Sequence, residues 1–77
     1  MGTVSFEELK NTIIAYVESV DSVRYVDLTE IIAKKLDIGP AIVSSVVKQL
    51  VDFGKLEGIS DEGGFGWKYI QLPEKEN

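Results

Sequence analysis

The side chains that most often carry out catalysis are scarce in this chain. Its 77 residues include no cysteine and no histidine, so thiolate ligands, the commonest general base and the commonest transition-metal ligand are all missing. No serine, threonine or lysine has a candidate base nearby in the sequence, and the lack of histidine excludes a hydrolytic triad. We therefore expect a protein that is not an enzyme and has no catalytic residue.

Two patterns near the C-terminus come closest to ligand-binding chemistry. Asp61-Glu62, together with Asp27 or Glu57, would offer oxygen ligands to a hard cation, but no loop has the ligand spacing of a calcium site. Gly63-Gly64-Phe65-Gly66 lacks the following Lys-Ser/Thr and the strand-to-helix context of a phosphate-binding loop. We interpret the first pattern as solvated carboxylates and the second as a hairpin tip, and we expect no metal and no cofactor.

The composition indicates one small globular domain. A chain of 77 residues builds a core too small to enclose a deep active site as well. Its formal net charge is −5, with 13 acidic against 8 basic residues, and this sign opposes non-specific binding to a phosphate backbone. The sequence contains neither an apolar run long enough for a membrane span nor a signal peptide. We expect a cytoplasmic protein without a membrane partner.

The first half of the chain predicts two helices with a short strand between them. Ser5-Phe6-Glu7-Glu8 has the pattern of a capping box and opens the first helix. Residues 23–26 alternate and are β-prone, and Asp27-Leu28-Thr29-Glu30 repeats the cap pattern before the second helix. The residues expected to face the core recur at helical spacing; they are Phe6, Leu9, Ile13, Tyr16, Val17 and Val20 in the first helix, and Leu28, Ile31, Ile32 and Leu36 in the second.

The second half predicts a third helix followed by a β-hairpin. Gly39-Pro40 opens the helix, with proline at its favoured first position, and Gly54 ends it. The two strands are expected at residues 55–60 and 66–72, with the glycine-rich tip between them. The prediction is thus a single α+β domain over residues 1–77 with its core in 5–72 and a tail at 73–77, in the order helix, strand, helix, helix, hairpin.

The apolar spacing of the last two helices resembles that of winged helix-turn-helix domains. Leu28-x-x-Ile31-Ile32-x-x-x-Leu36 matches the first of them, and Val43-x-x-x-Val47-x-x-Leu50-x-x-x-Gly54-x-Leu56 matches the second helix and its exit. The resemblance covers Asp27 to Leu72. It implies a winged-helix fold and a binding function, because winged helices contact DNA, RNA and proteins alike.

Two kinds of winged helix resemble this chain in more detail. Gly54-Lys55-Leu56 and Trp67-Lys68 resemble the Zα family, which binds left-handed DNA through an Asn and a Tyr on the recognition helix and two prolines in the wing. Ser44, Lys48 and Gly63-Gly64 occupy those positions here. In size and acidity the chain is also similar to winged helices that dock proteins, such as those of ESCRT-II and of the middle subunit of replication protein A.

The third helix supplies the candidate DNA contacts. With Val43, Val47 and Leu50 facing the core, the outward residues are Pro40, Ala41, Ser44, Ser45, Lys48, Gln49 and Asp52. Recognition helices reach bases and phosphates from such positions. The predicted DNA-binding residues are Ser44, Ser45, Lys48 and Gln49, with Lys68 as a wing contact. A continuous positive patch joining Arg24, Lys34, Lys35 and Lys48 would favour DNA, whereas scattered cations would favour a protein partner.

Some apolar residues in and after the third helix are not assigned to the core, and they suggest protein binding as the alternative to DNA binding. Ile42, Val46, Val51 and Phe53 cannot all share the inward stripe, so they are covered by the wing and the first helix or form an exposed strip. In the second strand, Trp67 and Tyr69 should share one face, while Lys68, Ile70 and Leu72 share the other, of which Ile70 and Leu72 pack on the helices. The indole then either roofs the core or anchors a partner.

Two functions therefore remain, and the fold places DNA binding first, with protein docking as the alternative. The fold-level resemblance favours a transcription-associated protein that binds double-stranded DNA. The charge favours a module that docks a protein or forms a homodimer through Ile42, Val46 and Trp67. A dimer that presents two recognition helices to paired half-sites would combine the two.

Overall fold

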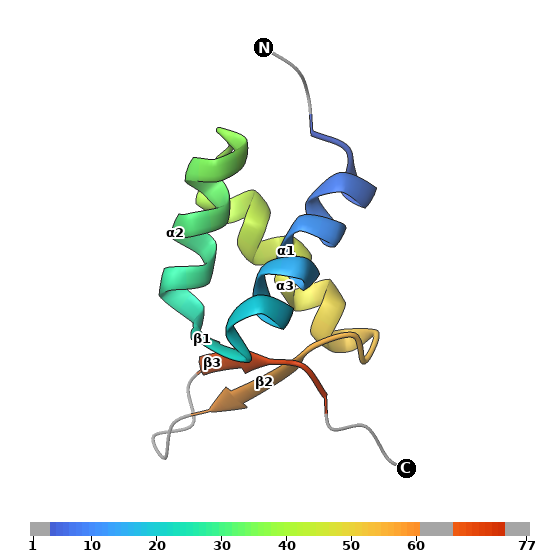
Figure 1. Cartoon of the computed structure of the whole chain (residues 1–77), viewed down its shortest axis with the longest axis vertical. Helices are drawn as coiled ribbons and strands as arrows, with labels where there is room; N and C mark the ends of the chain where they lie inside the picture. Colours follow the sequence, from blue (N-terminus) through green and yellow to red (C-terminus); the bar gives the residue numbers. More distant parts are fainter. Residues whose placement is uncertain (1–3, 61–65, 74–77) are drawn as a thin grey trace.

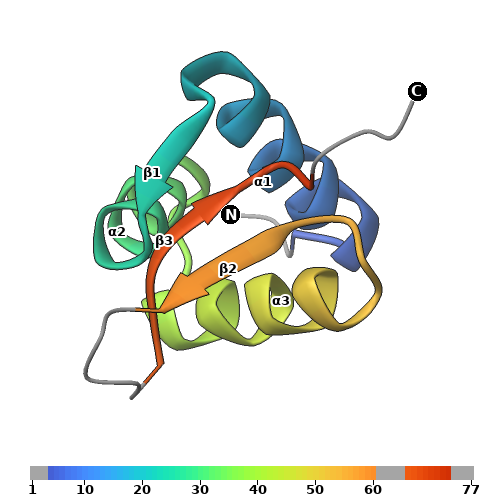
Figure 2. The same ribbon diagram turned by 90° about the horizontal axis from the view of Figure 1, so that it is seen from below.

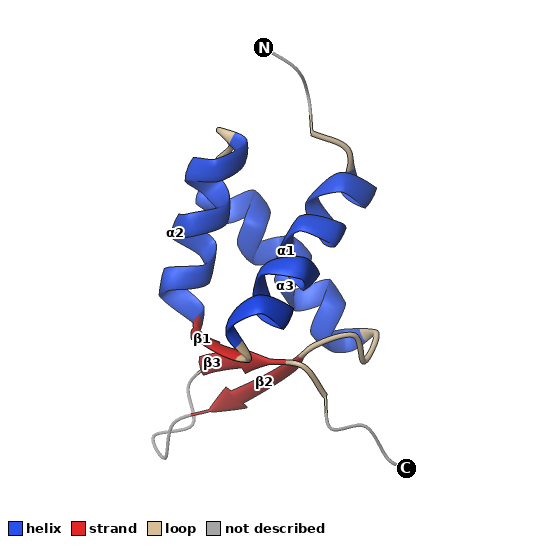
Figure 3. Cartoon of the chain, viewed as in Figure 1, coloured by secondary structure: helices blue, strands red, loops and turns tan. Residues whose placement is uncertain are grey.

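Three helices and a small antiparallel sheet make up the described part of the chain (Figures 1 and 3). The structure is a computed structural model that describes residues 4–60 and 66–73. The elements are α1 (Phe6–Val20), β1 (Ser22–Arg24), α2 (Tyr25–Leu36), α3 (Pro40–Asp52), β2 (Glu57–Ser60) and β3 (Trp67–Gln71). This order and the α+β class confirm the sequence prediction, and the layout is compatible with a winged helix. The expected tip, including Asp61, Glu62 and residues 63–65, lies outside the described residues.

The sheet lies at one end of the helical layer (Figure 1), and its strands follow the order β1-β3-β2. Figure 2 looks onto the sheet, with β3 in the middle. Val23 and Gly58 both pair with Ile70 across the sheet. Directly paired residues share a face, and Ile70 is fully buried, so this row faces the helices. The prediction that Ile70 packs on the helices is confirmed.

The core is formed by one face of each helix together with single residues from the hairpin. Its buried apolar members are Leu9, Ile13, Val17, Leu28, Ile32, Ala33, Val43, Val46, Val47, Leu50, Leu56 and Ile70. The prediction was wrong for Phe6 and Val20, which are exposed. Both lie on the expected stripe of α1, but at its two ends, where the helix extends past the core. Among the described residues, none of the helices is long and apolar enough to cross a membrane.

Helix α2 begins three residues earlier than the cap pattern indicated. Its first residue is Tyr25, and Arg24 takes the N-cap position without a side-chain hydrogen bond. The buried face of α2 includes Thr29, whose hydroxyl donates to the Val26 carbonyl oxygen at 2.8 Å. Ile31 was expected to face the core but is exposed, because the buried stripe of α2 is formed by Leu28, Thr29, Ile32 and Ala33 and Ile31 lies beside it.

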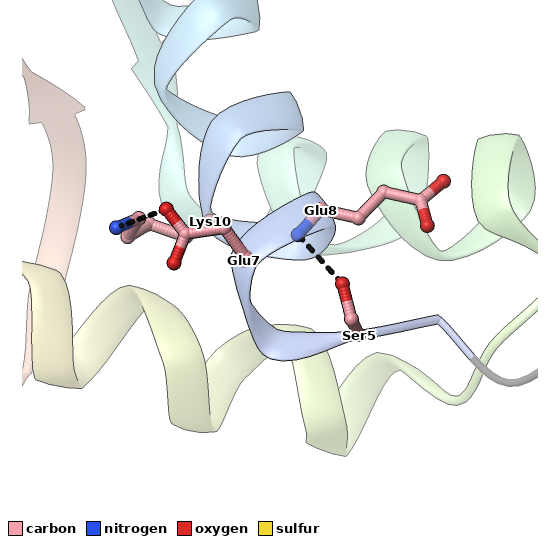
Figure 4. Close-up of polar contacts among 4 residues, drawn as sticks. All are labelled: Ser5, Glu7, Glu8 and Lys10. Carbon is pink, nitrogen blue, oxygen red and sulfur yellow. Dashed lines mark hydrogen bonds and ion pairs between the residues drawn. The ribbon is translucent and has the colours of Figure 1, made fainter.

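Helix α1 has the predicted N-cap (Figure 4). The Glu8 N–H donates to Ser5 Oγ at 3.0 Å, which satisfies one of the free amides at the helix start. The Glu8 carboxylate extends away from Ser5, and one turn along the helix Lys10 Nζ lies 2.9 Å from Glu7 Oε2. The predicted helix boundary is confirmed, and this exposed ion pair contributes little to stability.

The N-cap gives a stability prediction. Replacing Ser5 by alanine removes the acceptor of the Glu8 N–H and should lower the free energy of unfolding by about 1 kcal/mol. Urea denaturation measures this change, and Ser5→Asp is the matched control because aspartate caps equally well. An unchanged midpoint in Ser5→Ala would show that the cap does not contribute.

Helix α3 ends in a tight turn that leads into the hairpin. Gly54 has a φ of 77°, a conformation that glycine adopts without strain. The N–H groups of Lys55 and Leu56 both donate to the Leu50 carbonyl oxygen, at 2.8 and 3.2 Å. These bonds give a partner to a carbonyl group that the end of the helix would otherwise leave free, and the turn places Leu56 in the core. The predicted role of Gly54 is confirmed.

Candidate binding surface

Four buried side chains fix the rotation of α3 about its axis. Val43, Val47 and Leu50 were predicted to face the core and do so, and Val46 joins them with 6% exposure. Helix α3 packs with this face against α1 and α2. Val46, which we expected as a candidate interface residue, is therefore part of the core and cannot anchor a partner at the surface.

The side of α3 next to the hairpin is held by a hydrogen bond. The hydroxyl groups of Tyr25 and Ser44 are hydrogen-bonded to each other and partly buried. Ser44 was expected as a DNA contact, but its hydroxyl instead joins α3 to the start of α2. Of the predicted contacts on α3, Ser45, Lys48 and Gln49 are exposed and form an outward polar face.

A β-bulge sets the position of Trp67. Ile59 pairs with Tyr69, but the next residue, Ser60, pairs with Trp67, so Lys68 is an extra residue in β3. The prediction that Trp67 and Tyr69 share a face is wrong, because the bulge interrupts the alternation. Trp67 is half-buried and packs against the core, whereas Tyr69 is exposed. Lys68 was expected on the opposite face from Tyr69, yet its Nζ lies 5.9 Å from the centre of the Tyr69 ring.

The indole of Trp67 packs between the hairpin and α2. Its ring centre is 5.7 Å from that of Tyr25, and the two planes meet at 86°, which is a favourable edge-to-face arrangement. It also lies over Gly58, where a Cβ would come within 2.5 Å of indole Cδ1 and Nε1. A shallow groove of about 360 Å³ remains between α3 and β3, lined by Tyr25, Lys48, Gly66 and Trp67. Trp67 thus roofs part of the core and also borders a surface groove.

The opposite flank of α3 is apolar and exposed. Ile42 is 54% exposed and Phe53, directly after the helix, is 69% exposed. The Phe53 N–H still donates to the Gln49 carbonyl oxygen at 2.9 Å, so it continues the helical turn. Gln49 and Phe53 follow Ile42 by about two and three turns of 3.6 residues, so all three lie on one flank. We name Ile42, Gln49 and Phe53 the α3 strip.

The sequence analysis placed both Ile42 and Phe53 in a possible exposed strip, but only Ile42 was among the predicted interface residues. Of the four leftover apolar residues, Val46 is buried and Val51 is half-buried against the core, while Ile42 and Phe53 remain exposed. The spacing of 42, 49 and 53 was available as a signal. It could not show that Val46, 40° away on the same helix, would be covered.

The cations proposed for a DNA-binding patch are separated. Arg24 lies at the sheet end of α2 and Lys34 near its far end (Figure 1), about 15 Å apart at 1.5 Å per residue. Lys34 borders a groove with Glu30 and Asp37. Lys35 borders another groove, whose lining includes Glu7 and Glu8. Carboxylates are therefore interspersed with these cations.

Within residues 4–60 and 66–73, no three Asp, Glu, His or Cys side chains are grouped so as to hold a metal ion. Neither the family models nor the curated proteins compared with this chain include a match.

The contact between Gly58 and Trp67 gives a second stability prediction. Gly58→Ala should lower the free energy of unfolding by about 1–3 kcal/mol, because the added methyl overlaps the indole. Urea unfolding followed by far-ultraviolet circular dichroism measures this cost. In a Trp67→Leu background the same substitution should cost much less. Equal costs in the two backgrounds would contradict the assigned contact.

Proposed function

We propose that the protein is a non-enzymatic winged-helix module that binds another protein through the α3 strip. The observation that carries this proposal is the exposure of Ile42 and Phe53, at 54% and 69%, on one flank of α3. Complete burial of an isoleucine or phenylalanine side chain contributes about 1.5–3 kcal/mol. The cores of protein interfaces are also depleted in charged residues, and the α3 strip contains no charge.

Charge supports a protein partner over a nucleic acid. The net charge of −5 opposes approach to phosphates. Lys48 is the single cation within α3, and Asp52 on the same helix offsets it. The separation of Arg24 from Lys34 and Lys35 leaves no long positive track among the described residues on which a duplex could lie.

A photocrosslinker tests the nature of the partner. With p-benzoylphenylalanine in place of Phe53, irradiation in extracts of the native host should give adducts that protease removes and nuclease does not. The same amino acid at the exposed α1 residue Asn11 is the matched control and should give few adducts. Adducts that nuclease removes, or equal yields at the two positions, would contradict a protein-binding α3 strip.

Double-stranded DNA is the second candidate, as the target of a transcription-associated regulator. The observation that favours it is the exposure of Ser45, Lys48 and Gln49 on α3, with Lys48 beside the groove that Trp67 borders. In this candidate α3 would lie in the major groove, and Lys68 in the bulge of β3 would contact the backbone.

Fluorescence anisotropy with labelled duplex DNA tests this candidate. If α3 contacts phosphates, binding should weaken steeply with salt, and Lys48→Ala should reduce both the affinity and the salt dependence. Lys10→Ala, which removes the same charge from α1, should leave both unchanged. Our leading proposal predicts no specific binding even at low salt. Salt-dependent binding that only Lys48→Ala weakens would establish the DNA candidate instead.

A further inference from the structure

The groove between α3 and β3 combines a cation with two aromatic side chains. Its described lining is Tyr25, Lys48, Gly66 and Trp67, around a volume of about 360 Å³. We propose that this groove binds a single carboxylate side chain of the protein partner, which pairs with the Lys48 ammonium. This inference rests on the proposed function, and it names the chemistry that the partner presents next to the residues that cover the α3 strip.

Lys48 is available for such a contact. Its side chain is exposed, and no ion pair or hydrogen bond joins its ammonium to another described residue. The grooves that contain Lys34 and Lys35 differ, because carboxylates also line both of them. The described lining of the Lys48 groove contains no carboxylate. A carboxylate that enters this groove therefore meets a cation that its described neighbours in the groove do not neutralise.

Contacts outside the groove hold its aromatic walls in place. The hydroxyl group of Tyr25 is bonded to that of Ser44. The Trp67 indole meets the Tyr25 ring edge-on and lies over Gly58. Because these contacts fix both rings, little ordering is needed when a ligand binds, which favours affinity. The rings offer apolar surface to the methylene groups of an aspartate or glutamate, while the Lys48 ammonium pairs with the carboxylate.

The charges near the groove select one carboxylate over a run of phosphates. Asp52 follows Lys48 by four residues, so the two side chains are neighbours on α3. A second negative charge beside the first would be repelled by Asp52. Duplex DNA has one charge about every 1.7 Å along its axis, and a phosphorylated side chain has a charge of about −1.5 to −2. A carboxylate has a single charge, which one ammonium neutralises.

The net charge of −5 does not prevent this local pairing. At physiological salt the Debye length is about 8 Å, so exposed charges farther away than this are largely screened from the groove. The closest cation and the closest carboxylate on α3 therefore decide which ligand enters. Lys48 lines the groove and Asp52 is not among its lining residues.

One partner segment can reach both the groove and the α3 strip. Lys48 and Gln49 are consecutive residues, so their side chains point about 100° apart around α3. On a helix about 10–12 Å across, this angle corresponds to about 10 Å along the surface. An extended chain covers that distance in about three residues. We expect the partner to place an aspartate or glutamate about three residues from an apolar residue that contacts Ile42 or Phe53.

Selection from a displayed library of random peptides tests the inference. Peptides are selected on the purified unmodified chain, on Lys48→Glu and on Lys34→Glu, which makes the same charge change on α2 and is the matched control. The unmodified chain and Lys34→Glu should enrich peptides that combine an acidic residue with an apolar one, and Lys48→Glu should lose the acidic residue. Equal acidic enrichment on Lys48→Glu would overturn the inference. Selection of peptides without an acidic residue, or of no peptide at all, by the unmodified chain would also overturn it.

The fluorescence of the single tryptophan locates the contact. That tryptophan is Trp67, so its emission should shift when a selected peptide enters the groove. Replacing the acidic residue of the peptide by its amide should weaken binding about two- to fivefold, as expected for an exposed ion pair. Lys48→Gln should have the same effect, and the two changes together should cost no more than either alone. Losses that add would overturn the inference.

The same peptides separate this inference from the proposed function. Peptides that Phe53→Ser weakens but that bind Lys48→Gln at full affinity would overturn the carboxylate site and leave the α3 strip as the binding surface. Peptides that Phe53→Ser does not weaken would contradict the proposed function. Duplex DNA that shifts the Trp67 emission and displaces the peptides would overturn both.

Discussion

The rotation of α3 about its own axis is the constraint on which the surface of this protein depends. Val43, Val47 and Leu50 are completely buried, and the bond between the Tyr25 and Ser44 hydroxyl groups holds the side of the helix next to the hairpin. Because these contacts lie on different sides of α3, the helix cannot turn without losing at least one of them. This rotation exposes a polar face with Lys48 and, beside it, the α3 strip, in which the polar Gln49 lies between the apolar Ile42 and Phe53.

The hairpin is held by a second set of contacts that depends on one extra residue. The bulge at Lys68 turns Trp67 towards the helices, where the indole meets Tyr25 edge-on and lies over Gly58. Tyr25 therefore contacts both α3 and β3, through its hydroxyl and its ring respectively. One aromatic residue at the start of α2 thus connects α3 to the hairpin.

Much of the fold was predictable from local patterns in the sequence. The Ser5 cap, Pro40 at the start of α3 and Gly54 at its end mark element boundaries through backbone chemistry that needs no tertiary information. The predicted start of α2 was wrong because Asp27 resembles a cap but lies within the first turn. The helix begins earlier, at Tyr25, whose side chain makes tertiary contacts with α3 and β3. The predicted face of Trp67 was wrong because a bulge depends on the pairing of two strands, and the sequence of one strand does not show it.

The binding surface was less predictable than the fold. Helical spacing placed Ile42 and Gln49 outside the core, but the burial of Val46 and the engagement of Ser44 depend on neighbouring elements. The most direct test of a protein-docking α3 is a pair of 15N–1H titrations of the labelled chain, one with an extract of the native host and one with duplex DNA. Our account predicts that the extract shifts or broadens the signals of Ile42, Gln49 and Phe53, that the signals of Asn11 and Lys34 stay steady, and that DNA has no effect. Signals of Ser45 and Lys48 that shift with DNA, while those of Ile42 and Phe53 do not respond to the extract, would contradict it.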